Sequence, residues 1–471
     1  MGGMIEMNRR LRFISVFLVI ALLLCSCGKS AEKEKGINRK PADADVTKKV
    51  TPTSAPTATP TLLPTASPEP TGIPEPETNA DLANYLINCW KNGDIESIMP
   101  YVSELILQQA GNLTEGMFLD PLALYGEVEK VDQTTYKPEH SQDGYDNYFF
   151  IFHFAHSEMR ITLAIKDLML CGMREDVIFK EEFDIVHENG VVETCFLMNC
   201  DGALLNAVYT HPAEETGTTV LLIPGSGPTD VNEANGALAT FRDMANGLAE
   251  QGIASLRLEK RTFRYREDYL EYVDLQDEYF DDFGNAITWI KENTSTERLF
   301  LLGHSLGSQI APVLAENNEV AGLILLNGTA RHLADVMYDQ YVALDPNNAA
   351  TYEQASEYVK ALTEDSGKGY FYYGAPEGYW VDYNRLDTIQ TVRKLRLPTL
   401  IINSTKDTQI FEADRELWKK ELAGQTDVTI RVMDKISHPG YEKDVNDPTV
   451  HCTRDAFSEE LLKYIGEFIF Y

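Results

Sequence analysis

The chain lacks an excess of positive charge. Its 471 residues include 73 acidic and 41 basic side chains, which gives a formal net charge of −32. This charge excludes nucleic acid as a partner, because binding it requires cationic groups that replace its counterions. Anionic substrates are disfavoured for the same reason.

A zinc-binding cysteine pattern is also absent. The chain has seven cysteines, and their spacing fits no structural zinc site. Cys195 and Cys200 lie close in sequence, but no second pair of cysteines or histidines stands beside them. We therefore predict free thiols, no metal and no cofactor, while a Cys195–Cys200 disulfide stays open for an oxidising compartment.

Long hydrophobic runs are scarce. The apolar stretch from Phe13 to Leu24 covers about 12 residues, too short to span a bilayer comfortably and typical of a secretory signal. The tetrapeptide Leu24-Cys25-Ser26-Cys27 that ends it resembles a bacterial lipobox. This resemblance implies a lipoprotein signal peptide over residues 1–26 and a lipid anchor on Cys27, facing the extracytoplasmic side of the cell membrane. The alternatives are a plain signal peptide or an uncleaved anchor.

Two regions precede the main body of the chain. Residues 27–79 are rich in Pro and Thr, which predicts a disordered tether. Residues 80–179 predict a small α+β domain of unknown role, with an amphipathic helical segment over 81–102 followed by strands. The helix-then-strands order and the WKNGD-type helix end resemble small cone-shaped domains similar to nuclear-transport-factor folds. His153 and His156 lie three apart on one predicted strand and would face opposite sides, so we interpret them as structural histidines.

From residue 180 to 471 apolar strands alternate with amphipathic helices. Short antiparallel strands lead in, and then TVLLIPG, IASLRLE, RLFLLG, VAGLILLN, LPTLIINS and VTIRVMD supply the strands. This alternation predicts an α/β fold with a mostly parallel central sheet covered by helices on both faces. Ligands bind such sheets at the carboxyl ends of the strands.

One strand end carries the pentapeptide GHSLG around Ser305. The strand RLFLL precedes it and the helical segment LGSQIAPVLAEN follows, which is the strand–turn–helix setting of a nucleophile elbow. The flanking glycines let neighbouring backbone approach, so the serine hydroxyl can project outward. We therefore predict Ser305 as a catalytic nucleophile.

A serine hydroxyl needs a base and an orienting carboxylate. In the order Ser, acid, His, the candidate base is His438, just after the last strand; His451 is a weaker alternative. The candidate acid is Asp407, after LPTLIINS. Asp434 lies too close in sequence to the histidine, and the segment NGTA after VAGLILLN has no carboxylate.

The oxyanion hole needs two backbone N–H groups. We predict Leu306, at the start of the helix after the nucleophile, and Ser226, in the glycine-rich loop PGSGPTD. The segments IPGSGPTD, GHSLGS, STKDTQI and ISHPGY together resemble bacterial serine esterases of the α/β-hydrolase superfamily. The resemblance implies the α/β-hydrolase fold and the same five residues in the same roles. Two segments depart from the family pattern: VNEANG after GPTD, and KRTFRY in place of a glycine-rich turn.

Residues 329–397 form an aromatic-rich insertion, which we interpret as a helical lid. Its aromatic side chains would line the substrate pocket or pack the lid against the body of the domain. The sequence thus predicts a serine hydrolase that cleaves small carboxylic esters through an acyl-enzyme. A peptidase or amidase with the same triad, or a binding module on a hydrolase scaffold, are the alternatives.

Overall fold

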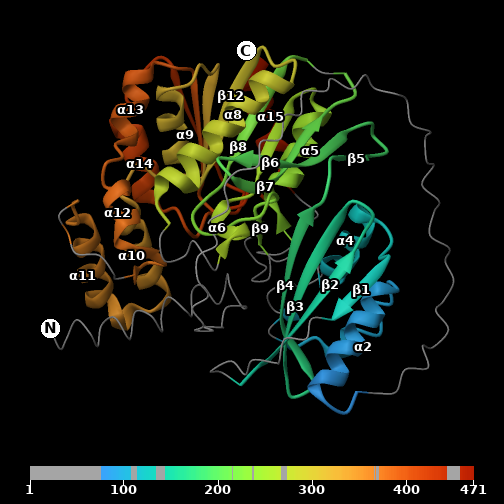
Figure 1. Ribbon diagram of the computed structural model, residues 1–471. Helices are drawn as coiled ribbons and strands as arrows, with labels where there is room; N and C mark the ends of the chain where they lie inside the picture. The colour runs from blue at the N-terminus through green and yellow to red at the C-terminus, as the bar shows by residue number, and fades with distance from the viewer. Residues whose placement is uncertain are drawn as a thin grey trace.

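The computed structural model describes residues 76–104, 106–107, 114–133, 144–214, 216–235, 238–266, 273–364, 366, 371–442 and 457–470. These residues form a small α+β unit followed by a larger unit built around a long sheet (Figure 1). The predicted signal peptide, Cys27 and nearly all of the predicted tether lie outside the described residues, as does His451. None of the described helices combines the length and the apolar character needed to cross a bilayer.

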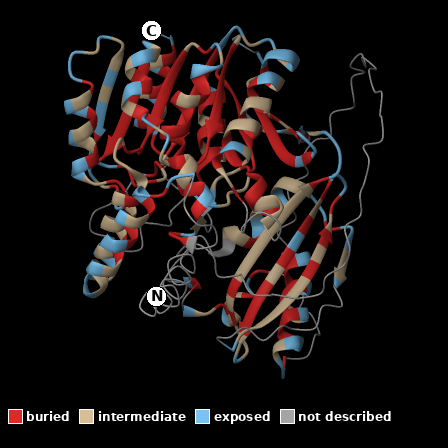
Figure 2. Ribbon diagram, turned by 60° about the vertical axis from the view of Figure 1, so that its left-hand side comes forward, coloured by how far each residue is buried: buried red, intermediate tan, exposed pale blue. Residues whose placement is uncertain are grey.

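The small unit contains a four-stranded antiparallel sheet in the order β1-β2-β3-β4. Its elements are α2 (Asn79–Lys91), α4 (Thr114–Tyr125), β1 (Lys130–Gln133), β2 (Asp146–His153), β3 (Ser157–Lys166) and β4 (Met169–Phe179). One face of this sheet packs on α2, where Trp90 contacts Phe118 and Phe152 edge-to-face. Every second residue of β3 is buried, as a sheet with one covered face requires (Figure 2).

Two local predictions for this unit are wrong. The first helix ends at Lys91 rather than at 102, because Asn92 and Gly93 turn the chain and Gly93 has a φ of +69°. His153 and His156 do not share a strand: β2 ends at His153, and His156 lies in the turn before β3. His153 contacts the carboxylates of Asp132 and Glu158.

The larger unit contains a nine-stranded sheet in the order β17-β16-β13-β12-β8-β11-β7-β6-β5. The strands are β5 (Phe183–Val186), β6 (Val192–Cys200), β7 (Ala203–His211), β8 (Thr218–Ile223), β11 (Ala254–Leu258), β12 (Arg298–His304), β13 (Gly322–Leu326), β16 (Thr399–Ser404) and β17 (Val428–Met433). The six from β17 to β11 run parallel, and β7, β6 and β5 pair antiparallel. The predicted α/β-hydrolase fold is confirmed.

Helices cover both faces of this sheet, so its central strands are buried almost throughout (Figure 2). The helices are α5 (Thr240–Glu250), α6 (Arg261–Arg264), a π-helical turn (Gln276–Asp281) that runs into α8 (Asp282–Asn293), α9 (Gly307–Glu316), α14 (Glu412–Glu421) and α15 (Glu459–Phe470). Side chains of α5 and α15 pack on one face, and those of α8, α9 and α14 on the other. The alternate residues of each strand therefore enter two separate cores.

The insertion between β13 and β16 is mostly helical. It contains α10 (Leu333–Leu344), α11 (Ala349–Lys360), a two-residue hairpin pair β14 (Phe371–Tyr372) and β15 (Ala375–Pro376), α12 (Glu377–Tyr383) and α13 (Thr388–Leu395). Figure 1 shows α10, α11 and α12 projecting from one end of the large sheet. The helix α13 returns the chain to the body of the larger unit, beside α9.

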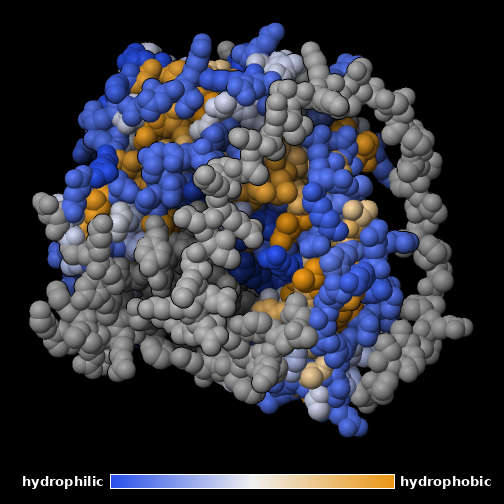
Figure 3. Space-filling view, viewed as in Figure 1, coloured by the Kyte–Doolittle hydropathy of each residue, from blue (hydrophilic) through white to orange (hydrophobic). Residues whose placement is uncertain are grey.

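The two units contact each other through β4. The Asn206 side chain on β7 donates to the Val177 carbonyl (2.6 Å) and accepts from the Phe179 N–H (3.1 Å). Arg264, in the segment KRTFRY, donates to the same Val177 carbonyl (2.8 Å) and pairs with Asp176 (3.3 Å). The visible surface of both units is largely hydrophilic (Figure 3), in keeping with the strong net charge.

Candidate active site

Ser305 lies in the sharp turn between β12 and α9. Its φ of +54° is in the left-handed region, which costs a non-glycine residue about 1–3 kcal/mol and recurs at functional turns. Its N–H donates to the Leu326 carbonyl of the neighbouring strand (2.9 Å). A Cβ on Gly303 would lie 2.0 Å from the Gly307 carbonyl oxygen, and one on Gly307 would lie 2.2 Å from that of Ile223. Both glycines are thus required for the backbone to pack at this turn.

Asp407 and His438 meet at the same edge of the sheet. Asp407 follows β16 and His438 follows β17, and both are buried. The His438 Nδ1 lies 2.7 Å from Asp407 Oδ2, while Asp407 Oδ1 accepts from the N–H groups of Gln409 (2.7 Å) and Ile410 (3.0 Å). The carboxylate is therefore fixed on both oxygens. Asp434, the alternative acid, is exposed.

His438 is tied to the nucleophile turn through its main chain. Its carbonyl faces His304 Nε2 (3.0 Å) and accepts from the side-chain amide of Asn327 (2.7 Å). His304 immediately precedes Ser305, and its ring centroid lies 4.8 Å from that of His438. Among the described residues, the Ser305 hydroxyl makes no side-chain hydrogen bond. The structure thus joins Asp407 to His438 and brings the histidine beside the serine turn, with the serine–histidine hydrogen bond unmade.

The loop after β8 lies against Ser305. A Cβ added to Gly225 would be 3.0 Å from the Ser305 Cβ and 3.4 Å from its Oγ, so any larger residue would crowd the serine side chain. The Gly225 carbonyl accepts from Lys260 Nζ (2.9 Å) and from the Tyr279 hydroxyl (2.5 Å). In a trans peptide the carbonyl and the next N–H point in opposite directions. The two donors therefore fix the direction of the Ser226 N–H.

Leu306, the second predicted oxyanion donor, is buried at the N-terminal end of α9. The amide of a residue at a helix start has no partner within the helix, and the helix dipole favours negative charge there. Leu306 follows Ser305 in the chain and the Gly225–Ser226 loop approaches its side chain, which suits a pair of N–H donors.

Four residues at this site have no role predicted from the sequence: Glu233, which accepts from the Gly225 N–H, and His304, Lys260 and Tyr279. Lys260 is fully buried, which lowers the pKa of its ammonium, while the carboxylate of Glu278 at 3.3 Å opposes that change. The one signal in the sequence is that Lys260 and Glu233 fall in KRTFRY and VNEANG, the two segments that depart from the family pattern.

The insertion packs on the nucleophile helix. The Tyr383 hydroxyl donates to the side chain of Gln309 on α9 (2.5 Å) and accepts from the Leu333 N–H (2.9 Å). The aromatic rings of the insertion pack on one another. Those that are buried are Tyr341, Tyr352, Tyr372, Tyr373, Tyr379, Trp380 and Tyr383. These rings stabilise the insertion and attach it to the body.

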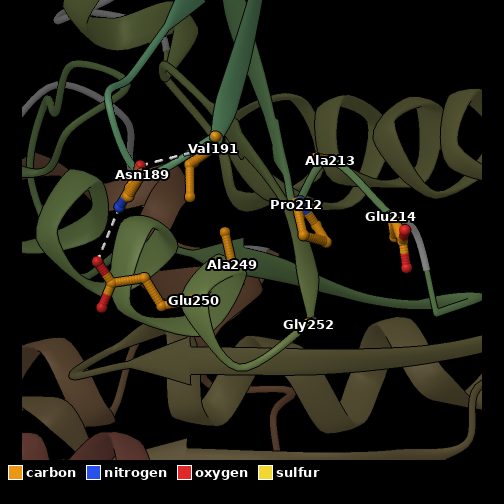
Figure 4. A pocket seen from close by; sticks show the side chains of 9 residues that line it. Asn189, Val191, Pro212, Ala213, Glu214, Ala249, Glu250 and Gly252 are labelled. Carbon is orange, nitrogen blue, oxygen red and sulfur yellow. Dashed lines mark hydrogen bonds between the residues drawn. The ribbon is translucent and has the colours of Figure 1, made fainter.

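Two further features lie away from this site. A hollow of about 350 Å³ is lined by the turn after β5, the end of β7 and the end of α5 (Figure 4). It lies where the parallel strands begin, at the opposite edge of the sheet from Ser305. Cys195 and Cys200 are free thiols. They lie five residues apart on β6, about 16 Å along an extended strand, so a disulfide between them is impossible.

The topology and the strand–turn–helix at Ser305 define an α/β-hydrolase fold with a candidate serine-hydrolase site. Residues 234–349 match the family model described as serine aminopeptidase, S33. Over 221 residues the chain is 34% identical to Esterase EstD of Thermotoga maritima, a match that covers 46% of this chain and 53% of that relative. The matched region thus spans about half the length of the curated relative.

The chain is also similar to two solved structures, at low sequence identity. Est1E from Butyrivibrio proteoclasticus, in a form with ferulic acid bound, is 16% identical over 58% of this chain and 96% of its own, with a TM-score of 0.39. The Pyrococcus furiosus esterase Pf2001 is 16% identical over 61% of this chain and 90% of its own, with a TM-score of 0.38.

Proposed function

We propose that the chain is a serine hydrolase that cleaves small carboxylic esters through a covalent acyl-enzyme. The observation that carries this proposal is the buried Asp407–His438 hydrogen bond at 2.7 Å, beside a serine in a left-handed turn at the carboxyl edge of the sheet. The similarity to an esterase over 221 residues supports an ester rather than another acyl compound.

The proposed reaction has two halves. His438 Nε2 takes the hydroxyl proton of Ser305 as the oxygen attacks the ester carbonyl, and the amides of Ser226 and Leu306 stabilise the resulting oxyanion. His438 then gives the proton to the departing alcohol, which leaves an acyl-serine. A water molecule, deprotonated by His438, attacks this acyl group and releases the acid. Asp407 holds the Nδ1–H throughout, so that Nε2 can accept a proton.

The unmade serine–histidine hydrogen bond fits this scheme. In enzymes without substrate such catalytic hydrogen bonds are often long and tighten in the substrate complex. The site that binds the substrate is walled, in this proposal, by the insertion at residues 329–397, whose Tyr383 contacts α9 directly.

A serine aminopeptidase is the second candidate, because the matching family model carries that description. The same triad attacks amides, so the geometry at Ser305 does not separate the two activities. We keep the ester as the first proposal because the 34% identical relative is an esterase.

The experiment compares p-nitrophenyl esters of increasing acyl length with aminoacyl p-nitroanilides, using the full chain and Ser305→Ala. We expect ester hydrolysis that falls about 10⁴-fold or more in the variant. Preferential cleavage of anilides would promote the aminopeptidase, and ester hydrolysis unaffected by the substitution would overturn the site.

The proposed location is the outer face of the cell membrane, through a lipid on Cys27. This proposal rests on the lipobox resemblance at residues 24–27. Cells that express the chain and receive labelled palmitate should yield a labelled, membrane-bound protein, whereas Cys27→Ala should yield an unlabelled one. Equal labelling of both would contradict the anchor.

A further inference from the structure

Glu233 and His304 connect the two halves of the candidate site. We propose that they form a second, buried carboxylate–imidazole pair that positions both His438 and the Gly225–Ser226 peptide for catalysis. The inference rests on the proposed function and adds two positioning residues to it.

The Glu233 carboxylate contacts both the Gly225 backbone and the His304 ring. Glu233 Oε1 accepts from the Gly225 N–H (2.7 Å), and Glu233 Oε2 lies 2.9 Å from His304 Nδ1. His304 Nε2 lies 3.0 Å from the His438 carbonyl oxygen. A chain of three hydrogen bonds thus runs from the loop of the predicted oxyanion donor Ser226, through two side chains, to the main chain of the predicted base.

This series of hydrogen bonds needs two protons at the His304 ring, one for each ring nitrogen. Both nitrogens of His304 face oxygen atoms, and the His438 carbonyl oxygen can only accept. A neutral imidazole carries one N–H and would satisfy only one of the two contacts. The Glu233–His304 pair must therefore hold one proton on Nε2 and another between Nδ1 and Oε2, and the proposal assigns the second proton to the ring, as an imidazolium beside a carboxylate.

The pair is built into the fold. The side chains of His304 and Glu233 are 6% and 10% exposed, so water does little to screen their interaction. Glu233 adopts a φ of +47°, and its N–H donates to the Asp230 carbonyl (3.2 Å), which closes the turn that carries it. A left-handed conformation at a non-glycine residue costs about 1–3 kcal/mol and persists where the surroundings hold it.

The groups around His304 come from four elements. Glu233 faces it from the loop after β8, Asp407 from the loop after β16 and His438 from the loop after β17, and the ring of Phe241 on α5 lies edge-to-face at 6.4 Å. Burial lowers the pKa of His304, but the charge and hydrogen bond of Glu233, the His438 carbonyl and the charge of Asp407 raise it above its usual value overall.

The sign of the pH dependence follows. A group whose pKa is raised in the folded state keeps its partner at low and neutral pH and loses it as the pH rises through the folded value. Deprotonated His304 would place a nitrogen lone pair against the Glu233 carboxylate, and the chain of hydrogen bonds would break. We therefore expect a loss of kcat on the alkaline side that originates from this pair.

Removing the Glu233 side chain should displace the catalytic groups that it positions. Without Glu233 nothing holds the His304 ring through Nδ1, so its bond to the His438 carbonyl is weakened and the bond from Asn327 becomes the main anchor of that carbonyl. A displacement of about 1 Å at a reacting group can cost about 100-fold in rate. We expect Glu233→Ala to lower kcat by about this factor with KM within about twofold, since no substrate contact is removed.

The conservative variant Glu233→Gln separates position from charge. The amide oxygen can still accept from the Gly225 N–H, and the amide nitrogen can donate to Nδ1 of a neutral His304, whose Nε2–H still reaches the His438 carbonyl. This variant should retain kcat at neutral pH within about threefold and lack the alkaline loss. Asp132→Asn, which alters the carboxylate paired with His153 in the small unit, is the matched control and should match the unaltered chain.

The experiment measures pH profiles of kcat and KM for p-nitrophenyl acetate with these three variants and Ser305→Ala, together with ¹⁵N spectra of the His304 ring at pH 7. The proposal predicts two protonated ring nitrogens. It is overturned by full kcat in Glu233→Ala, by an alkaline loss unchanged in Glu233→Gln, or by a neutral His304 ring. If the unaltered chain hydrolyses no ester, the proposed function fails, and the ring spectrum still decides whether the pair exists.

Discussion

Replacing Asp407 by Asn tests the proposed reaction with the smallest change of shape. The carboxylate accepts three hydrogen bonds: two from backbone N–H groups on Oδ1, and one from His438 on Oδ2. In the Asn variant the amide oxygen can keep the two backbone bonds. The amide nitrogen then faces His438 Nδ1, so the imidazole must carry its proton on Nε2, where it cannot accept one from Ser305.

The expected magnitudes follow from these contacts. The stability cost should be about 1.5–3 kcal/mol, because one hydrogen bond to a charged group is lost while the other two remain. The kcat should fall about 10⁴-fold, the effect known for the same change in a serine protease triad. A large loss of kcat with a small loss of stability would show that the wrong histidine tautomer, rather than unfolding, causes the defect.

The assay is p-nitrophenyl ester hydrolysis, paired with a thermal melt of each protein. Asp434→Asn is the matched control, because Asp434 is exposed in the same part of the sheet edge and should leave kcat unchanged. An Asp407→Asn protein that keeps more than a tenth of the kcat would refute the role assigned to the carboxylate.

Three other predictions concern stability and reactivity. Gly303→Ala should prevent folding, since its Cβ would overlap the Gly307 carbonyl, whereas Gly284→Ala on α8 meets no atom within 4 Å and should raise the melting temperature through a gain of about 1 kcal/mol. Burial raises the pKa of each β6 thiol to about 12, so iodoacetamide at pH 8 should alkylate peptide 192–200 only in denaturant; labelling of the native chain would contradict this. Burial opposes ionisation of Glu193, but the charge of Arg257 prevails and lowers its pKa to about 2, so the stability it contributes is present above about pH 4.5 and is lost as the pH falls through about 2. Acid unfolding should therefore be less steep in Glu193→Gln.

The sequence predicts the fold well where its signal is periodic. Apolar runs such as TVLLI and GLILL become the fully buried strands β8 and β13, because only a sheet covered on both faces buries every residue of a strand. The order of Ser305, Asp407 and His438 suffices to place them at one edge, since each follows a parallel strand. The first helix is shorter than the predicted segment because Asn92 and Gly93 form a turn directly after Lys91.

The rest of the site depends on contacts between distant segments. Nothing local to VNEANG predicts that Glu233 reaches His304, 71 residues further along the chain. The buried positions of Lys260 and Tyr279 on the Gly225 carbonyl likewise arise from packing of three separate elements. Asn327 follows β13 at the other position where such folds carry the acid, and its side-chain amide donates to the His438 carbonyl.

The central claim is that His438 activates Ser305. Its most direct test is the adduct formed with a fluorophosphonate probe, mapped by mass spectrometry of the digested chain in the unaltered protein and in His438→Ala. We expect one adduct, on the peptide that contains Ser305, formed at least 100-fold more slowly in the variant. An adduct on another residue, or equal rates in the two proteins, would contradict it.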